Sequence, residues 1–364
     1  MYSEIIKIIE GGLKKDLKKV HSYSKLLADK FKEEGDEKMA ALILNLLNQK
    51  MTNSITLDEL ISQVPVDQDS RMNILDVYIP ESNPTPLVLS SIVQGKIESF
   101  INSISHRQEL LKHGVISTST LLLYGAPGVG KTSIAKYISE QTGLPLVVAR
   151  LDAIVSSLLG NTAKNIRKIF EYADSKPCIL FLDEFDAIAK SRDDKFELGE
   201  LKRVINSLLQ NIDAFSQNNI LIAATNHAEL LDKAIWRRFN TVIEVAIPSQ
   251  EDTASLIKLF LKGFDTDFLD DKKKLDKIAE LVSGKSPSDI KAILHRAITQ
   301  SIIEKEKLIT FQEVLIEVYD FEHHSKYSVD ELVKYLDDNG VAKTQIAEKL
   351  DISIRQVRNK LHEN

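Results

Sequence analysis

The sequence predicts an α/β fold, built on a parallel sheet of five strands and flanked by small all-helical units at both ends. Between residues 86 and 250, short apolar runs alternate with longer amphipathic stretches. The runs are apolar at successive positions, which is typical of strands buried on both faces of a sheet. A glycine-rich stretch follows the first run, and both ends of the chain repeat apolar residues at helical spacing.

Composition limits the class of protein. The chain has 364 residues, of which 43% are hydrophobic and 27% charged, as in soluble globular proteins of two or three domains. No apolar run approaches the roughly 18 residues of a membrane span, and the first residues lack a signal-peptide pattern. The single cysteine, Cys178, excludes an internal disulfide, and a net charge of −6 gives no global attraction to nucleic acid. We expect a cytoplasmic protein.

The N-terminal part is expected to hold a helical unit and a linker. In residues 1–50, Val20, Tyr23, Leu27 and Phe31 share one helical face, which predicts a helical hairpin that serves as a targeting or partner domain. Residues 51–85 are polar and contain several prolines, so they are predicted to be a linker.

The central and C-terminal parts divide into three predicted units: an α/β domain over residues 86–249, a helical domain over 250–320 and a small helical unit over 325–364. The strands expected in the α/β domain are residues 120–124, 144–150, 178–183, 220–225 and 241–247.

A phosphate-binding loop is predicted directly after the first strand. GAPGVGKT fits the pattern G-x-x-x-x-G-K-[ST], the Walker A motif, and it opens a helical stretch. Glycines allow backbone N–H groups to surround phosphates, and Lys131 is expected to reach the β- and γ-phosphates. The predicted ATP-binding residues are Gly125, Ala126, Pro127, Gly128, Val129, Gly130, Lys131, Thr132 and Ser133.

An acidic pair follows the strand CILFLD. Asp183 and Glu184 are expected at its carboxyl end, beside the phosphate loop, as in a Walker B motif. Asp183, together with the Thr132 hydroxyl, is predicted to hold Mg²⁺, and Glu184 is predicted to be the base that polarises the attacking water. The alternative is that the pair caps the next helix. Asp186 is interpreted as structural.

These motifs, together with residues 218–248, resemble the AAA family of ATPases. The resemblance covers roughly residues 86–310 and includes four motifs in the family's order. It implies that Asn226 senses the γ-phosphate and that Arg237 and Arg238 reach the ATP of a neighbouring subunit. The compact Arg-Arg-Phe form is more similar to the branch of microtubule-severing and membrane-sorting ATPases. Either arginine could instead form an ion pair within its own chain.

The same resemblance implies a homo-oligomeric ring, a hexamer, because arginines that act in trans need a neighbour. It also implies that residues 250–310 form the family's lid domain. Here Pro287 and Ser288 replace the Gly-Ala pair of the family's lid turn, which weakens any inference about adenine or ribose contacts. The helix from Ser288 is still expected to begin near the nucleotide.

A pore loop is implied at Leu158, Leu159 and Gly160, in the place of the family's aromatic–aliphatic–glycine loop. Leucine offers less contact area than an aromatic residue and no stacking face, so a weaker hydrophobic grip on a polypeptide is expected. The alternative is that both leucines belong to the helix-packing core.

The last residues, 341–364, resemble a helix-turn-helix, with Asp351 at a turn position that glycine often occupies. The second helix would expose side chains that suit phosphates and base edges in DNA, namely Arg355, Gln356, Arg358, Asn359 and Lys360. An exposed basic face is also common on helices that bind proteins or only water.

The leading hypothesis is therefore an ATP-hydrolysing ring that remodels or threads a protein partner, such as a bacterial effector or protease encoded beside it. Two alternatives remain open: an ATP-switched regulator that binds DNA through its tail, and a non-hydrolysing nucleotide-bound scaffold.

Overall fold

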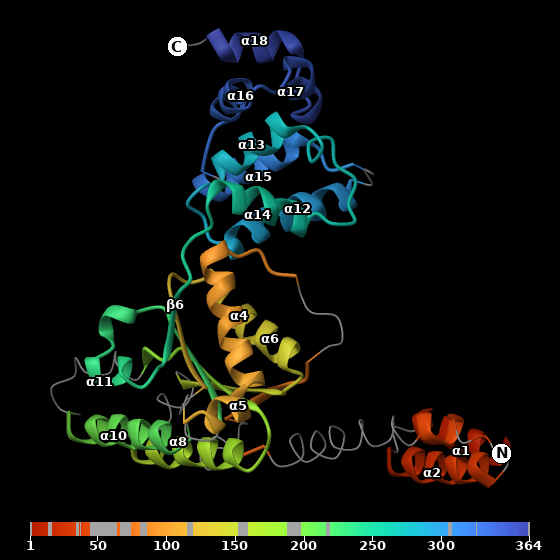
Figure 1. Ribbon diagram of the computed structural model, residues 1–364. Helices are drawn as coiled ribbons and strands as arrows, with labels where there is room; N and C mark the ends of the chain where they lie inside the picture. Colours follow the sequence, from red (N-terminus) through yellow and green to blue (C-terminus); the bar gives the residue numbers. More distant parts are fainter. Residues whose placement is uncertain are drawn as a thin grey trace.

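The computed structural model describes residues 2–13, 17–33, 36, 38–43, 64–65, 74–80, 86–114, 119–151, 159–187, 198–215, 219–304, 308–324 and 326–362. Within them, an α/β body is joined through the strand β6 to a helical body that holds the C-terminus (Figure 1).

The α/β body is built on a sheet whose described strands follow the order β1-β3-β4-β5-β2-β6. All neighbours from β3 to β6 in this order are parallel, which confirms the predicted fold class. The strands are β1 (Asp76–Tyr78), β2 (Ser119–Tyr124), β3 (Leu146–Arg150), β4 (Ile179–Asp183), β5 (Ile220–Thr225) and β6 (Thr241–Glu244).

The predicted number of strands was wrong, because β1 adds a sixth. It lies within residues 51–85, which were expected to be a linker, and it pairs antiparallel with β3. Three residues are too few for an alternating pattern to be visible in the sequence. The strand exists because its residues pair with β3 much later in the chain, with Val77 opposite Val147.

Helices cover both faces of the sheet, as the apolar strands require. On β2, Leu122 packs in the core beneath α8 and α10, while Leu121 and Leu123 pack in the core beneath α4 and α6. Successive residues of one strand therefore enter opposite cores. The helices of this body are α4 (Ser91–Ser105), α5 (Arg107–Lys112), α6 (Lys131–Thr142), α8 (Leu159–Asp174), α10 (Leu198–Phe215) and α11 (Lys233–Trp236), with the short 3-10 turn η2 (Ala228–Leu230).

The helical body begins after β6, and three of its helices start at capping boxes. Ser286, Thr310 and Ser328 each form a capping box with the acidic residue three positions later. We call α12 to α15 the lid and α16 to α18 the tail. Their bounds are α12 (Gln250–Phe260), α13 (Lys272–Leu281), α14 (Pro287–Ile303), α15 (Phe311–His323), α16 (Val329–Asp338), α17 (Lys343–Lys349) and α18 (Ile354–His362).

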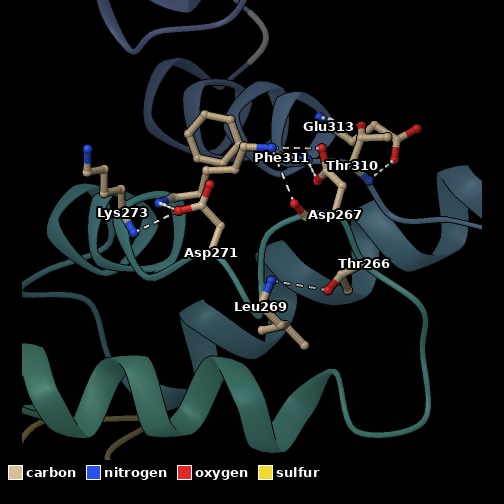
Figure 2. A network of polar contacts seen from close by, with 9 residues as sticks. Thr266, Asp267, Leu269, Asp271, Lys273, Thr310, Phe311 and Glu313 are labelled. Carbon is tan, nitrogen blue, oxygen red and sulfur yellow. Dashed lines mark hydrogen bonds and ion pairs between the residues drawn. The ribbon is translucent and has the colours of Figure 1, made fainter.

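Asp267 links the loop after α12 to the start of α15 (Figure 2). Its carboxylate accepts a hydrogen bond from the backbone N–H of Phe311 at 2.6 Å. The same carboxylate forms an ion pair with Lys274 at 3.1 Å. Thr266 and Ile309 form a single parallel bridge beside it. These contacts hold the loop after α12 against the start of α15.

The lid and the tail share one hydrophobic core. Val333, Ile346 and Val357 of the tail pack in the same cluster as Val314 and Val318 of α15. Lys349 on α17 reinforces this contact through ion pairs with Glu313 at 2.7 Å and Glu304 at 2.6 Å. The side chain of Glu313 is only 2% exposed, so the ion pair is nearly dry.

The described N-terminal residues form the helices α1 (Tyr2–Leu13) and α2 (Leu17–Glu33), which pack on each other, and a helical segment at 38–43. Asp36 accepts a hydrogen bond from the N–H of Met39 and so starts that last segment. In the part of the chain that the structure describes, no helix combines the length and the apolar character needed to cross a membrane.

Candidate nucleotide site

The phosphate loop lies between β2 and α6, and its backbone depends on glycine. Gly125, Gly128 and Gly130 all have positive φ angles, of 148°, 77° and 101°. A Cβ atom on Gly125 would stand 2.2 Å from the carbonyl oxygen of Val245, so no other residue fits there. Ala126, Pro127 and Gly128 form the exposed tip of the loop, and α6 begins at Lys131.

Lys131 lies inside this loop. Its Nζ donates to the carbonyl oxygens of Gly125 at 2.8 Å and Ala126 at 2.9 Å, and the residue is 7% exposed. Burial lowers the pKa of its ammonium group, whereas the carboxylates of Asp183 and Asp186 act in the opposite direction. A cation held in this partly dry position can interact strongly with an anionic ligand.

Thr132 and Asp183 meet at the carboxyl end of the sheet. The Thr132 hydroxyl donates to Oδ2 of Asp183 at 3.1 Å, and the other carboxylate oxygen accepts the N–H of Glu184 at 3.0 Å. Hydroxyl and carboxylate oxygens are the ligands that Mg²⁺ prefers, so this pair fits the ion that the sequence implies. Ser133, one position further, is exposed on α6, and the side chain of Val129 packs in the core below the loop.

Glu184 has a backbone that favours glycine, with a φ of 52°. This conformation costs an ordinary residue on the order of 1 kcal/mol, and such strain is concentrated at functional sites. Its neighbours hold it in place, because the N–H of Phe185 donates to Ala224 at 2.9 Å and that of Ala187 donates to Glu184. The residue predicted as catalytic base is therefore the one at which the chain turns away from β4.

Asp186 connects the ends of β4 and β5. One carboxylate oxygen accepts hydrogen bonds from the Thr225 hydroxyl at 3.0 Å and from the N–H of Asn226 at 3.2 Å, and the residue is 3% exposed. Asn226 is thereby fixed next to the strand that carries Asp183. No sequence pattern indicates this contact, because the partners of Asp186 are about forty positions away in the chain.

The two predicted arginines differ in environment. Arg238 donates to Asp213 on α10 at 2.9 Å and to the carbonyl oxygen of Ala234, and its Nε is buried. Arg237 is exposed and forms no ion pair with any residue that the structure describes. An intrachain ion pair, one of the two alternatives for these arginines, is thus present at Arg238.

The lid contacts the phosphate loop directly. The N–H of Ser288 donates to the carbonyl oxygen of Gly128 at 3.2 Å, and a Cβ on Gly128 would meet the Ser286 hydroxyl at 2.6 Å. Pro287 is compatible with this arrangement because it takes the first position of α14, where its missing N–H is not needed. The helix from this turn thus begins beside the loop.

Leu158 lies outside the described residues. Leu159 and Gly160 occupy the first turn of α8, and the position of the Leu159 side chain lies outside what the structure describes.

The tail residues predicted to contact DNA fall into two groups. Gln356 accepts hydrogen bonds from the N–H and hydroxyl of Ser353, and Lys360 is paired with Asp330 of α16. Arg355, Arg358 and Asn359 are exposed on α18. Asp351 has a φ of 52°, the left-handed turn that was expected of it.

Comparison with known proteins identifies a family and several relatives. The model of the ATPase family associated with various cellular activities (AAA) matches residues 121–247, which include every element of the nucleotide site except the lid. An uncharacterized AAA family ATPase of Sinorhizobium fredii is 40% identical over 230 residues, which are 63% of this chain and 68% of the relative.

Two archaeal relatives match over a smaller part of their own length. A putative 26S proteasome regulatory subunit homolog of Methanocaldococcus jannaschii is 34% identical over 205 residues, 54% of each chain. The proteasome-activating nucleotidase of Methanococcus vannielii is 34% identical over 217 residues, 57% of this chain and 52% of its own. This chain thus spans about half the length of these two relatives. The phosphate loop, the acidic strand end and the extent of these matches lead to one conclusion: the chain belongs to the AAA family of ATPases.

Proposed function

We propose that this protein hydrolyses ATP within a homo-oligomeric ring, a hexamer, and uses the reaction to remodel or thread a protein partner. The observation that carries the proposal is the division of the site. Lys131, Thr132, Asp183 and Glu184 lie together, whereas Arg237 is exposed and unpaired within the described part of its own chain.

In the proposed mechanism, the backbone of the phosphate loop and Lys131 bind and orient the phosphates of ATP. Thr132 and Asp183 would hold Mg²⁺, which when bound offsets negative charge on the phosphates. Glu184 accepts a proton from the attacking water, and Asn226 orients that water. Arg237 of the neighbouring subunit stabilises the charge that develops during transfer, an effect of about 10³ to 10⁵ in rate in related systems.

A protein partner is supported by the names of the archaeal relatives, one of which activates a proteasome. We propose that Leu158, Leu159 and Gly160 contact the polypeptide in the channel of the ring. The N-terminal segment 1–50 and the tail then select the partner, which could be an effector or protease.

A second candidate is an ATP-switched regulator that binds DNA. The observation that favours it is the exposed group of Arg355, Arg358 and Asn359 on α18. Because Lys360 and Gln356 already have partners in the tail, three side chains instead of five are available for DNA.

The test is Glu184→Gln. Removing the base while keeping the shape should leave ATP affinity unchanged and lower turnover by at least about 10²-fold. The ring should persist in ATP, as measured by light scattering. Glu171→Gln, which changes an exposed glutamate on α8, is the matched control and should turn over like wild type.

Wild-type turnover in Glu184→Gln would remove Glu184 as the base. Absence of turnover in the wild-type ring would favour the scaffold. Material retained by the ATP-bound Glu184→Gln ring separates the two candidates, since a polypeptide supports remodelling and a salt-sensitive duplex DNA supports the regulator.

A further inference from the structure

The two arginines lie between two aromatic residues, and each of these contacts a catalytic element of the same chain. Trp236 precedes Arg237, and Phe239 follows Arg238. Trp236 meets the ring of Tyr124 edge-on, with centroids 5.5 Å apart and planes at 77°. Phe239 meets Phe185 in the same way, at 6.1 Å and 87°.

The partners of these aromatic residues adjoin the site. Tyr124 is the last residue of β2, so it directly precedes Gly125 of the phosphate loop. Phe185 directly follows Glu184, and its N–H fixes the turn in which Glu184 lies. The arginine segment therefore touches both the residue before the phosphate loop and the residue after the proposed base.

The position of α11 depends on such contacts because the helix has only four residues. Asp232 caps its start, and the Trp236 indole N–H donates to the carbonyl oxygen of Leu231 at 3.3 Å. Arg238 holds the far side through Asp213. Through its ring contact with Tyr124, Trp236 joins α11 to the strand that leads into the phosphate loop.

Tyr124 is itself attached to β6. Its carbonyl oxygen accepts the N–H of Val245 at 2.8 Å, and its hydroxyl donates to Glu244 at 3.3 Å. The carbonyl oxygen of Val245 stands directly over Gly125, where a Cβ would approach within 2.2 Å. Gly125 thus lies close to the backbone of Val245, whose N–H is bonded to Tyr124, so a shift of the loop backbone at Gly125 toward Val245 is expected to move Tyr124 as well.

We propose that Trp236 is a positioning residue: through Tyr124, and alongside the Phe239–Phe185 contact, it makes the placement of Arg237 depend on the nucleotide in the chain's own site. Occupancy of one site then changes turnover at the next site around the ring. This inference rests on the proposed function, in which Arg237 acts in trans.

The first experiment uses the fact that Trp236 is the chain's single tryptophan. Adding ADP or ATP to the full-length protein should change its intrinsic fluorescence at the concentrations at which nucleotide binds, and Lys131→Ala should abolish the change. If equilibrium dialysis shows saturated binding while the fluorescence stays constant, the phosphate loop does not act on Trp236 and the proposal fails.

The second experiment uses two kinds of subunit, a donor that supplies Arg237 to its neighbour and an acceptor that needs this arginine to hydrolyse ATP. Glu184→Gln subunits offer Arg237 but do not hydrolyse ATP, and Arg237→Ala subunits hydrolyse only with a neighbour's arginine. Mixed rings should therefore be active. If mixed rings without any Trp236 change stay inactive, the trans arginine and the proposed function fail, which is distinct from failure of the present inference.

Trp236→Ala is then added to one partner at a time. In the Glu184→Gln donor it should lower mixed-ring turnover by about tenfold, the factor that loss of one edge-on aromatic pair accounts for. In the Arg237→Ala acceptor it should change turnover and KM by less than about twofold. Trp236→Phe in the donor keeps an aromatic edge and should restore activity. Equal losses in donor and acceptor, or no loss in either, would overturn the proposal.

Discussion

Glu317 on α15 shows how a single partly buried carboxyl affects the stability of the lid. Burial raises the pKa of its carboxyl above the ordinary 4.5, and the charge of Asp320 adds to the increase, while Arg296 opposes it. The folded state therefore binds this proton more tightly than the unfolded state. The stabilisation is complete below pH 4.5 and is lost as the pH rises through the raised value.

Glu317→Gln should accordingly raise the free energy of unfolding at pH 7 and leave it nearly unchanged at pH 4. An amide cannot ionise, so the loss of stability with rising pH disappears. Denaturant unfolding at the two pH values measures the difference. Glu348→Gln, an exposed glutamate of α17, is the control. Equal effects of Glu317→Gln at both pH values would contradict the assignment.

Much of the site could be predicted residue by residue because its motifs are local. The phosphate loop and the acidic pair are each contained within nine residues, and their chemistry requires those residue types in that order. The partners of Asp186 and Arg238 could not be predicted, since Thr225 and Asp213 approach them only after the sheet has formed. Contacts between residues far apart in the sequence could not be predicted, even where they hold a predicted site residue in position.

At the scale of elements, the five buried strands are predictable and the sixth is not. A strand that is apolar at successive positions must be buried on both faces, and in this fold it lies between two layers of helices. β1 has no such run, and its conformation depends on a strand that comes much later in the chain. The packing of the tail on the lid could not be predicted for the same reason. The sequence of each helix indicates an apolar face, but not which other helix covers that face.

Lys349→Ala tests the packing of the tail on the lid. The substitution leaves the carboxylate of Glu313 buried without its cation, which should lower the free energy of unfolding of the helical body by about 3 kcal/mol. Thermal unfolding and limited proteolysis around residues 325–328 measure the loss. Lys343→Ala, at the exposed start of α17, should change neither. A melting temperature equal to that of wild type would mean that the shared hydrophobic core alone holds the tail.

At the scale of the whole molecule, the proposed site is complete only between two chains. Turnover per chain should therefore fall as the protein is diluted below the concentration at which rings form, while ATP affinity stays constant. Arg237→Ala should show low turnover at every concentration, with a normal melting temperature since its side chain is exposed.

Arg238→Ala provides the comparison for this dilution series. Unlike Arg237→Ala, it should lower the melting temperature, because it breaks the ion pair with Asp213. Arg355→Ala, an exposed arginine of α18, should behave like wild type in turnover and stability. Turnover per chain that is independent of concentration, measured down to the monomer, would show that a single chain suffices.

The core shared by lid and tail has a mechanical consequence. Since α12 to α18 pack as one unit, a rotation of the lid carries the tail with it instead of being absorbed at their junction. The amplitude of such a rotation grows with distance from the pivot, and α18 lies at the end of the body farthest from the sheet (Figure 1). The hydrogen bond from Ser288 to Gly128 joins the lid to the phosphate loop. A small rotation of the helical body beside the phosphate loop is therefore expected to produce a larger displacement of the tail.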